Sequence, residues 1–285
     1  MSVALVTDST AHLLPEVEKE HGIAVVPLQV VIDDVSYDEG SAEATPERVA
    51  AALREKRAVS TSRPSPAIFA DLYARLAGEG ATEIVSIHLS GEVSGTFESA
   101  LVASRQAPVP VTCVDTRQVG VATGYAVESA AAVLAGGGSA EEAAVAARAR
   151  AGAAASLFYV DTLEYLRRGG RIGAAAAVFG GALAVKPLLG IVDGVIAPRE
   201  KVRTAARAIA RLEGLAVEAA AEQRVEVTVA HLDAAERAAA LTRRISERLA
   251  DALEGRDVRC VELGAVLGAH VGPGMLAICV APLLV

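Results

Sequence analysis

The sequence has few aromatic residues and few cysteines. Tryptophan is absent, aromatic residues make up 3% of the chain, and the cysteines are Cys113, Cys260 and Cys279. The cysteines are widely spaced, form no C-x-x-C pair, and each lies in an apolar, β-like run. We therefore expect buried, reduced thiols rather than disulfides. Because the first residues lack a basic segment followed by a long apolar one, we predict no signal peptide and a cytoplasmic protein.

Positive charge is also scarce. The chain has 27 basic and 35 acidic side chains, with a formal net charge of −8. Lysine and arginine never occur in runs longer than two residues. Proteins that bind nucleic acids concentrate basic side chains to neutralise phosphates. We therefore expect no nucleic-acid partner.

Long apolar runs are missing as well. Residues 172–185 are uncharged, but this stretch is short, rich in glycine and alanine, and bounded by Arg171 and Lys186. The last apolar run, residues 275–285, is shorter still and contains Pro282. A membrane-spanning helix needs about 20 predominantly apolar residues. We expect at most a transient membrane contact.

Metal and nucleotide motifs are absent from the sequence. The five histidines show neither H-x-x-x-H nor H-E-x-x-H spacing. There is no Walker A motif, and no G-x-G-x-x-G follows a predicted strand. The glycine-rich residues 169–181 open an apolar helix rather than a phosphate-binding loop. We expect no metal and no cofactor.

The chain has the length and composition of a globular protein of one large or two medium domains. It contains 285 residues, of which 52% are apolar and 22% charged. Strands are predicted at residues 3–7, 23–31, 83–88 and 109–114. Helices are predicted between them, two of them starting at the N-cap and proline pairs Thr45-Pro46 and Ser65-Pro66. This order predicts an α/β fold with a parallel, Rossmann-like N-terminal sheet and flanking helices.

The pattern changes after an alanine-rich helix that ends near residues 151–155. We expect an N-terminal α/β domain at residues 1–155 and a C-terminal α+β domain at 156–285, and residues 60–80 could pack with the latter. In the second domain Asp193-Gly194 separates two short apolar runs, which predicts a β-hairpin. Helices at 203–214 and 234–253 and strands at 224–230, 257–263 and 275–281 complete the prediction.

Hydroxyl side chains gather at three predicted turns. These are Asp8-Ser9-Thr10, Ser60-Thr61-Ser62 and the segment Ser90–Thr96. In open α/β sheets ligands lie beyond the carboxyl ends of the strands, where helix N-termini offer unpaired N–H groups. Hydroxyls with little basic charge nearby suit one small anion, such as a carboxylate. The alternative is that they are ordinary helix caps and turns.

Six segments together resemble the DegV family. They are VTDST at the start, STSRPSP at 60–66, LSGEVSGTFESA at 89–100, YLRRGGRIG at 165–173, LAVKPLL at 183–189 and HVGPG at 270–274. They are similar, in the same order, to that family's TDS, TSQPSP, LSGTYQSA, GGRI, KP and HxGPG signatures. The resemblance implies a two-domain α/β fold that encloses one long-chain fatty acid, such as palmitate, stearate or oleate, between the domains.

The same resemblance implies a function without autonomous chemistry. The best understood members of this family are the fatty-acid-binding subunits of bacterial fatty acid kinase. They present the acyl carboxylate to a separate ATP-dependent kinase subunit, and the acyl phosphate enters phospholipid synthesis. The implied carboxylate-binding residues are Thr61 and Ser94, with Ser62, Gly95 and Thr96 close by and His270 near the head group. Arg171 and Arg203 match arginines implicated in docking the kinase.

Several positions depart from the family pattern. Arg63 replaces the usual glutamine, and it either adds charge near the head group or points to solvent. Gly91 replaces a serine, and Phe97-Glu98 replace Tyr-Gln. The segment 172–189 suits a helix that lines a narrow acyl tunnel, or alternatively a plain core helix.

Two other classes of function stay open from the sequence. Ser94 and His270 could serve a hydrolase or an acyl-transfer enzyme, although there is no G-x-S-x-G elbow and no third carboxylate can be chosen. An interaction module without a ligand is the third alternative.

Overall fold

The computed structural model describes residues 2–173, 175–179 and 185–283, which form two compact units. Unit 1 contains the residues up to Gln29 and Ser62–Gly152, and unit 2 contains Val30–Thr61 and the chain from Ala153 onward. The change of unit near residue 152 lies close to the boundary that the sequence suggests. The division differs from a contiguous domain 1–155, because residues 30–61 belong to unit 2 and residues 62–80 to unit 1.

Pro27 explains the first change of unit. The run predicted as one strand at 23–31 is two strands, β2 (Ala24–Val26) in unit 1 and β3 (Gln29–Ile32), which enters unit 2. Proline has no N–H to donate to a sheet, so the ladder stops there. The next N–H, that of Leu28, donates to Ser9 Oγ at 3.0 Å instead of to a strand.

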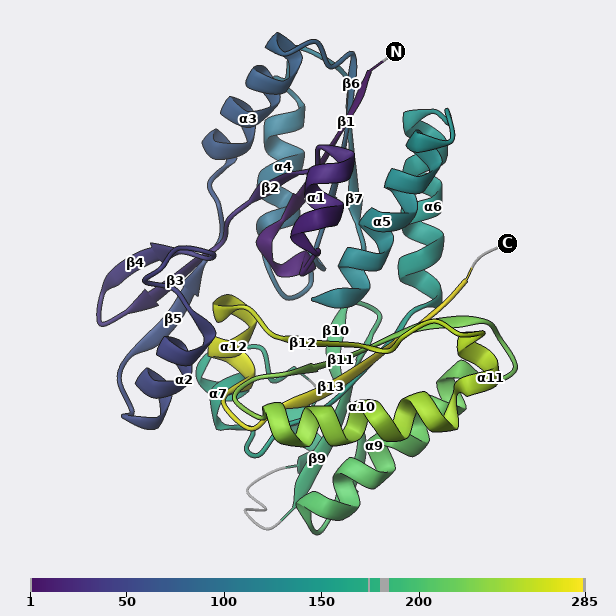
Figure 1. The fold of residues 1–285 in the computed structure, drawn as a ribbon. Helices are drawn as coiled ribbons and strands as arrows, with labels where there is room; N and C mark the ends of the chain where they lie inside the picture. Colours follow the sequence, from purple (N-terminus) through teal and green to yellow (C-terminus); the bar gives the residue numbers. More distant parts are fainter. Residues whose placement is uncertain (1, 174, 180–184, 284–285) are drawn as a thin grey trace. The chain divides into compact units, whose positions relative to one another are not determined.

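Unit 1 is built on a four-stranded parallel sheet in the order β2-β1-β6-β7 (Figure 1). The other strands are β1 (Val3–Asp8), β6 (Glu83–His88) and β7 (Val111–Asp115). The short helix η1 (Ser9–Ala11) and α1 (Pro15–His21) follow β1. The remaining helices of the unit are α3 (Pro66–Gly78), α4 (Thr96–Ser104), α5 (Val121–Ala135) and α6 (Ala140–Ala153).

Helices cover both faces of this sheet, as the strand-helix alternation predicts. Val6 and Ile84 pack with α3 and α4, whereas Leu5, Val85 and Ile87 pack with α5 and α6 on the opposite face (Figure 1). Neighbouring residues on a strand point to opposite faces, so a sheet buried on both sides reads as a continuous apolar run. Because β1 and β6 pair in parallel, their carboxyl ends lie side by side. The turns that follow the two strands are therefore at one edge of the sheet.

Unit 2 contains a mixed six-stranded sheet in the order β10-β9-β8-β13-β11-β12. Its strands are β8 (Ala155–Tyr159), β9 (Lys186–Val192), β10 (Val195–Val202), β11 (Val225–His231), β12 (Arg259–Glu262) and β13 (Leu276–Pro282). Helices α9 (Ala205–Ala220) and α10 (Ala235–Arg248) pack on one face through Leu212 and Leu241, and the short α11 (Ala250–Leu253) follows (Figure 1). The hairpin predicted at Asp193-Gly194 joins β9 to β10, with both turn residues at positive φ.

A second, smaller part of unit 2 includes a small sheet and one short helix that the sequence analysis missed. It contains a three-stranded sheet, β4 (Val35–Asp38), β3 and β5 (Val59–Ser62), and the predicted helix α2 (Pro46–Arg54). The short helices α7 (Glu164–Arg168), α8 (Ala175–Phe179) and α12 (Ala265–Val271) are also in this unit. Val30, Val49 and Ala269 share one apolar cluster, so α12 packs with α2. A helix as short as α12 gives too weak a periodic signal to be predicted.

Two further expectations need correction. Cys279 is buried, but Cys113 is only partly buried and Cys260 is exposed, because Cys260 lies on β12 at the edge of its sheet. The helix expected over 172–189 does not extend to its end, since Lys186 opens β9. Residues 174 and 180–184 of that segment lie outside the described residues. Among the helices of the described chain, none combines the length and apolarity that crossing a membrane requires.

Candidate functional site

The hydroxyls at Asp8-Ser9-Thr10 stabilise the fold rather than face a ligand. Asp8 is completely buried, and its Oδ1 accepts from the Thr10 backbone N–H at 3.2 Å and the Thr10 hydroxyl at 2.5 Å. Its Oδ2 accepts from the Leu89 N–H at 3.1 Å and lies 3.0 Å from His88 Nδ1. Asp8 thus ties the end of β1 to the end of β6, and ordinary turn chemistry accounts for this cluster.

A buried chain of donors continues from His88. The Tyr73 hydroxyl donates to Ser86 Oγ at 2.8 Å, and Ser86 Oγ lies 2.7 Å from His88 Nε2. With His88 Nδ1–H donating to Asp8 and Ser86 donating to His88 Nε2, each hydrogen bond in this series has one donor and one acceptor. The chain has the Ser-His-Asp composition of a hydrolase, but its serine is fully buried and already bonded to Tyr73. Ser86 is therefore shielded from any substrate.

The turn Ser90–Thr96 offers one accessible hydroxyl at the start of α4. Ser90 and Thr96 are completely buried, whereas Ser94 is partly exposed. Ser94 Oγ lies 2.9 Å from Thr96 Oγ1 and accepts from the Thr96 N–H at 3.4 Å. The N-terminus of α4 adds N–H groups and a partial positive charge to this turn. Of the sequence-predicted residues here, Ser94 is partly exposed, and the buried Thr96 bonds to it within the turn.

Arg63 lies on this turn. Its Nη1 donates to the Gly95 carbonyl at 3.0 Å, in the space that a side chain at position 95 would occupy. The guanidinium therefore places a positive charge at the turn that carries Ser94, while the Arg63 residue as a whole is exposed. Ser62, next to it, is exposed, and its hydroxyl donates to the Arg63 carbonyl at 3.4 Å.

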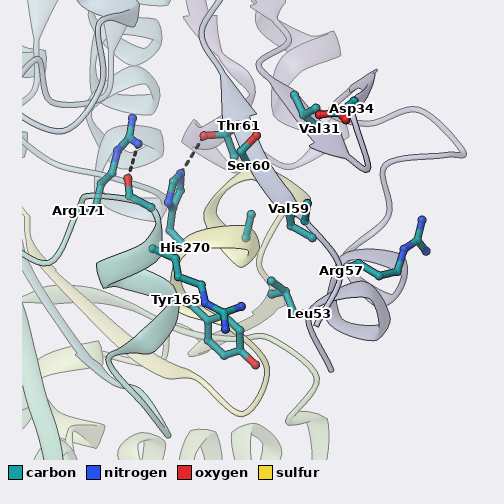
Figure 2. A pocket seen from close by; sticks show the side chains of 14 residues that line it. Val31, Asp34, Leu53, Arg57, Val59, Ser60, Thr61, Tyr165, Arg171 and His270 are labelled. Carbon is teal, nitrogen blue, oxygen red and sulfur yellow. Dashed lines mark hydrogen bonds between the residues drawn. The ribbon is translucent and has the colours of Figure 1, made fainter. Parts of the chain in front are cut away.

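In unit 2, Thr61 and His270 face each other across a sequence separation of 209 residues (Figure 2). His270 Nε2 lies 2.9 Å from Thr61 Oγ1. Thr61 is near the end of β5 and His270 near the end of α12. The small sheet and the helix that the sequence reading missed are thus the elements that bring two sequence-predicted site residues together.

His270 is a neutral group at ordinary pH. Burial of the ring, followed by the positive charge of Arg171, lowers the pKa of His270 from 6.5 to about 4. Its Nδ1 atom is buried without a hydrogen-bond partner among the described residues. A buried N–H without an acceptor is rarer than an unused lone pair, so we assign the proton to Nε2. Thr61 Oγ1 then accepts from His270, and its own hydroxyl proton can be donated to an anion.

A cavity of about 290 Å³ in unit 2 is lined by this pair (Figure 2). That volume is at the lower end of small-molecule pockets. Its other lining groups include Leu53, Arg57 and Val59, which the sequence did not single out, and Ser60, Tyr165 and Arg168, which lie in the family motifs. No local motif marks Leu53, Arg57 and Val59, because they reach the cavity only when β5 and α2 have packed.

The two predicted docking arginines have different surroundings. Arg171 is partly buried on the cavity wall, and its Nη1 donates to the Gly169 carbonyl at 2.5 Å (Figure 2). Arg203 is exposed, next to Thr204, whose hydroxyl caps α9 by accepting from the Arg207 N–H at 3.3 Å. Arg171 therefore contributes to the electrostatics of His270, and Arg203 does not share that cavity wall.

Within the described residues, no group of three or more His, Cys, Asp or Glu side chains is placed to hold a metal ion. Unit 1 offers the Ser94 hydroxyl, the N–H groups of α4 and the Arg63 guanidinium, and the cavity of unit 2 offers the Thr61 hydroxyl, an uncharged imidazole and arginines. The parallel sheet of unit 1 and the mixed sheet of unit 2 define a two-unit α/β protein with polar groups at helix and strand ends.

Comparison with known proteins identifies the family. The profile of the family described as "uncharacterised protein, DegV family" matches residues 2–283. A DegV domain-containing protein of Streptomyces coelicolor is 50% identical over 279 residues, covering 98% of each chain. The chain belongs to the DegV family.

Solved structures of relatives agree with this fold. A DegV family protein from Thermus thermophilus, described as fatty acid binding, has a TM-score of 0.91 at 33% identity, covering 99% of this chain and 100% of its own. DegV of Bacillus subtilis, described as a fatty acid binding protein, has a TM-score of 0.88 at 33% identity with the same coverage. The α/β architecture is thus shared over the whole chain.

Proposed function

We propose that this chain binds one long-chain fatty acid, such as palmitate, stearate or oleate. The carboxylate is held by the hydroxyls of Thr61 and Ser94, and His270 orients Thr61. The observation that carries the proposal is the Thr61–His270 pair, in which a neutral imidazole leaves the threonine hydroxyl free to donate. The fatty acids bound by the relatives of similar fold support it.

The energetics fit this division of roles. Burial of an acyl chain contributes about 0.8 kcal/mol per methylene, or on the order of 10 kcal/mol for a C16 tail before the cost of ordering it. A buried carboxylate needs hydrogen bonds, each worth about 1.5–3 kcal/mol when one partner is charged. The tail supplies the affinity, while the hydroxyls compensate for the water that the head group loses.

We further propose that the chain does no chemistry alone and presents the carboxylate to a separate ATP-dependent kinase subunit, in the cytoplasm, with Arg171 and Arg203 contributing to docking. A carboxylate held by neutral hydroxyls keeps its charge available as a phosphoryl acceptor. The hydrolase alternative is less well supported, since His270 bonds to Thr61, and the Ser94 hydroxyl bonds to that of Thr96.

Denaturing mass spectrometry of an organic extract of purified protein tests the ligand. We expect one fatty acid per chain, and a clean extract from protein that also rejects added oleate would contradict the proposal. For the second step, the loaded protein is incubated with ATP and a fatty acid kinase subunit, and acyl phosphate is trapped with hydroxylamine. Acyl hydroxamate should form only when both proteins are present, whereas ester hydrolysis by the protein alone would support the hydrolase.

A further inference from the structure

The segment around α7 and the segment after α12 pack together through their glycines. A Cβ atom at Gly272 would collide with the Tyr165 ring, and one at Gly274 with the Asp161 carboxylate. In the opposite direction, a Cβ atom at Gly169 would collide with the His270 ring. Each segment thus places a bulky side chain where the other has none. This accounts physically for glycines in both motifs.

Gly169 differs from Gly272 and Gly274 because its backbone dihedral angles are ones that any residue can adopt. Its φ of −74° and ψ of −8° are helical values that any residue adopts, whereas Gly272 and Gly274 have φ values of 75° and 88°. What a side chain at 169 lacks is space, since its Cβ would approach both Nδ1 and Cε1 of His270 closer than 3.0 Å.

The contact is with the Nδ1–Cε1 side of the ring, and Cε1 is bonded to the Nε2 atom that contacts Thr61. Gly169 faces Nδ1, while Nε2 bonds to Thr61 Oγ1 at 2.9 Å. Because Nδ1, Cε1 and Nε2 belong to one rigid ring, any movement that relieves the contact at Nδ1 and Cε1 also moves Nε2 relative to Thr61. A side chain at 169 should therefore change the hydrogen bond between His270 and Thr61.

We propose that Gly169 is a positioning residue that sets the orientation of His270, and through it the direction in which Thr61 donates. The proposal deepens the proposed function and rests on it, because the orientation of Thr61 matters for a ligand only if Thr61 holds the head group. The position of the ring itself can be measured without any ligand.

The test compares Gly169→Ala with Gly170→Ala, using NMR titration of histidine-labelled protein without lipid. Gly170 has a φ of 72° and nothing within 4 Å of its Cβ position, so alanine there strains the backbone without touching His270. In Gly169→Ala the displaced ring should regain water, and its pKa should rise by at least ~1 unit toward 6.5. Gly170→Ala should leave it near the wild-type value. An unchanged His270 titration in folded Gly169→Ala would overturn the proposal.

A double variant keeps the test decisive if Gly169→Ala folds poorly. Removing the ring with His270→Ala makes room for the new methyl group, so Gly169→Ala should lower the urea midpoint in the wild-type background and leave it unchanged in the His270→Ala background. Equal losses in both backgrounds would also refute the positioning role. If the titration shifts as expected but even wild-type protein binds no fatty acid, the proposed function fails and the positioning role stands.

Discussion

His88 and His270 each contact a hydroxyl group, but the two rings differ in how many of their nitrogens have a partner. His88 bonds through both ring nitrogens, to Asp8 and Ser86, and is completely buried. His270 bonds to Thr61 through Nε2, while its Nδ1 has no hydrogen-bond partner in the described part of the chain. A fully satisfied network rigidifies a fold, whereas a partly satisfied one marks a place where a ligand can complete it.

The depressed pKa of His270 predicts a loss of stability in mild acid. In the unfolded chain the ring titrates near 6.5, and in the folded protein near 4. The stabilisation is therefore fully present above pH 6.5 and is lost as the pH falls toward 4, because protons bind the unfolded state more readily. Between pH 7 and pH 5 the free energy of unfolding should decrease by about 2 kcal/mol through this group.

Urea unfolding at several pH values, compared between wild type and His270→Gln, measures this contribution. The glutamine variant cannot titrate, so its stability should vary less over this range. His231, whose pKa is also lowered by burial, is present in both proteins and cancels in the comparison. Identical pH profiles for the two proteins would show that His270 is not buried as a neutral ring.

Thr61 should be needed for its hydroxyl rather than for its shape. Thr61→Val keeps the volume and removes the donor, so delipidated protein should bind oleate at least ~10-fold more weakly, equivalent to about 1.4 kcal/mol. Thr61→Ser keeps the hydroxyl and should stay close to wild type. Fluorescence displacement or calorimetry gives both affinities, and equal affinity for the valine and serine variants would exclude a hydrogen bond from Thr61.

At the scale of elements, the turns that follow β1 and β6 combine two different kinds of polar group. Asp8 and its partners join the strands, while Ser94 and the N-terminus of α4 are available at the same edge of the sheet. The hydrogen bonds of Asp8 fix the backbone at the ends of both strands and do not use the Ser94 hydroxyl. The turn that carries Ser94 therefore starts from a rigid support.

Asp8→Ala should be one of the most destabilising single changes in unit 1. It leaves the buried Leu89 N–H, the Thr10 N–H and His88 Nδ1 without their acceptor. We expect a loss of at least ~3 kcal/mol in the free energy of unfolding, measured with urea. Ser104→Ala, which removes an exposed hydrogen bond to the Leu101 carbonyl, is the control and should cost less than about 1 kcal/mol. Similar losses for both variants would argue against the buried network.

At the scale of the whole molecule, a ligand that binds only the folded protein adds to its stability. The gain follows RT ln(1 + [L]/Kd), about 2.7 kcal/mol at 100-fold excess over Kd. Protein freed of lipid should therefore melt at a lower temperature, and added oleate should restore the melting temperature more than octanoate does, because a shorter tail buries fewer methylenes. Differential scanning calorimetry tests this, and equal responses to both acids would contradict tail burial.

The two arginines that we propose for docking the kinase should differ in their effects on acyl-phosphate formation and on the pKa of His270. Arg203 is exposed and lies off the cavity wall, so Arg203→Ala should slow acyl-phosphate formation by the kinase while lipid affinity stays unchanged. Arg171 depresses the pKa of His270, so Arg171→Ala should in addition raise that pKa. The kinase assay and the NMR titration distinguish them, and a loss of lipid binding in Arg203→Ala would refute its assignment to docking.

The sequence by itself determined the local features of this protein. The caps at Thr45-Pro46, the hairpin at Asp193-Gly194 and the alternation of strands and helices in unit 1 depend on residues close together in the chain. Such signals act through backbone dihedrals and hydrogen bonds over a few residues, so they survive in any context. The family motifs that contain Thr61 and His270 are likewise short, local stretches of sequence.

Tertiary structure decided which of these groups meet. Residues 30–61 join unit 2 because Pro27 ends one ladder and the strands beyond it find partners elsewhere. Asp8 joins the ends of β1 and β6 by hydrogen bonds, and His270 contacts Thr61 although 209 positions separate them in the sequence. Both contacts depend on packing that no local pattern encodes. Burial then lowered the pKa of His270, since the desolvation of a ring depends on everything that surrounds it in space.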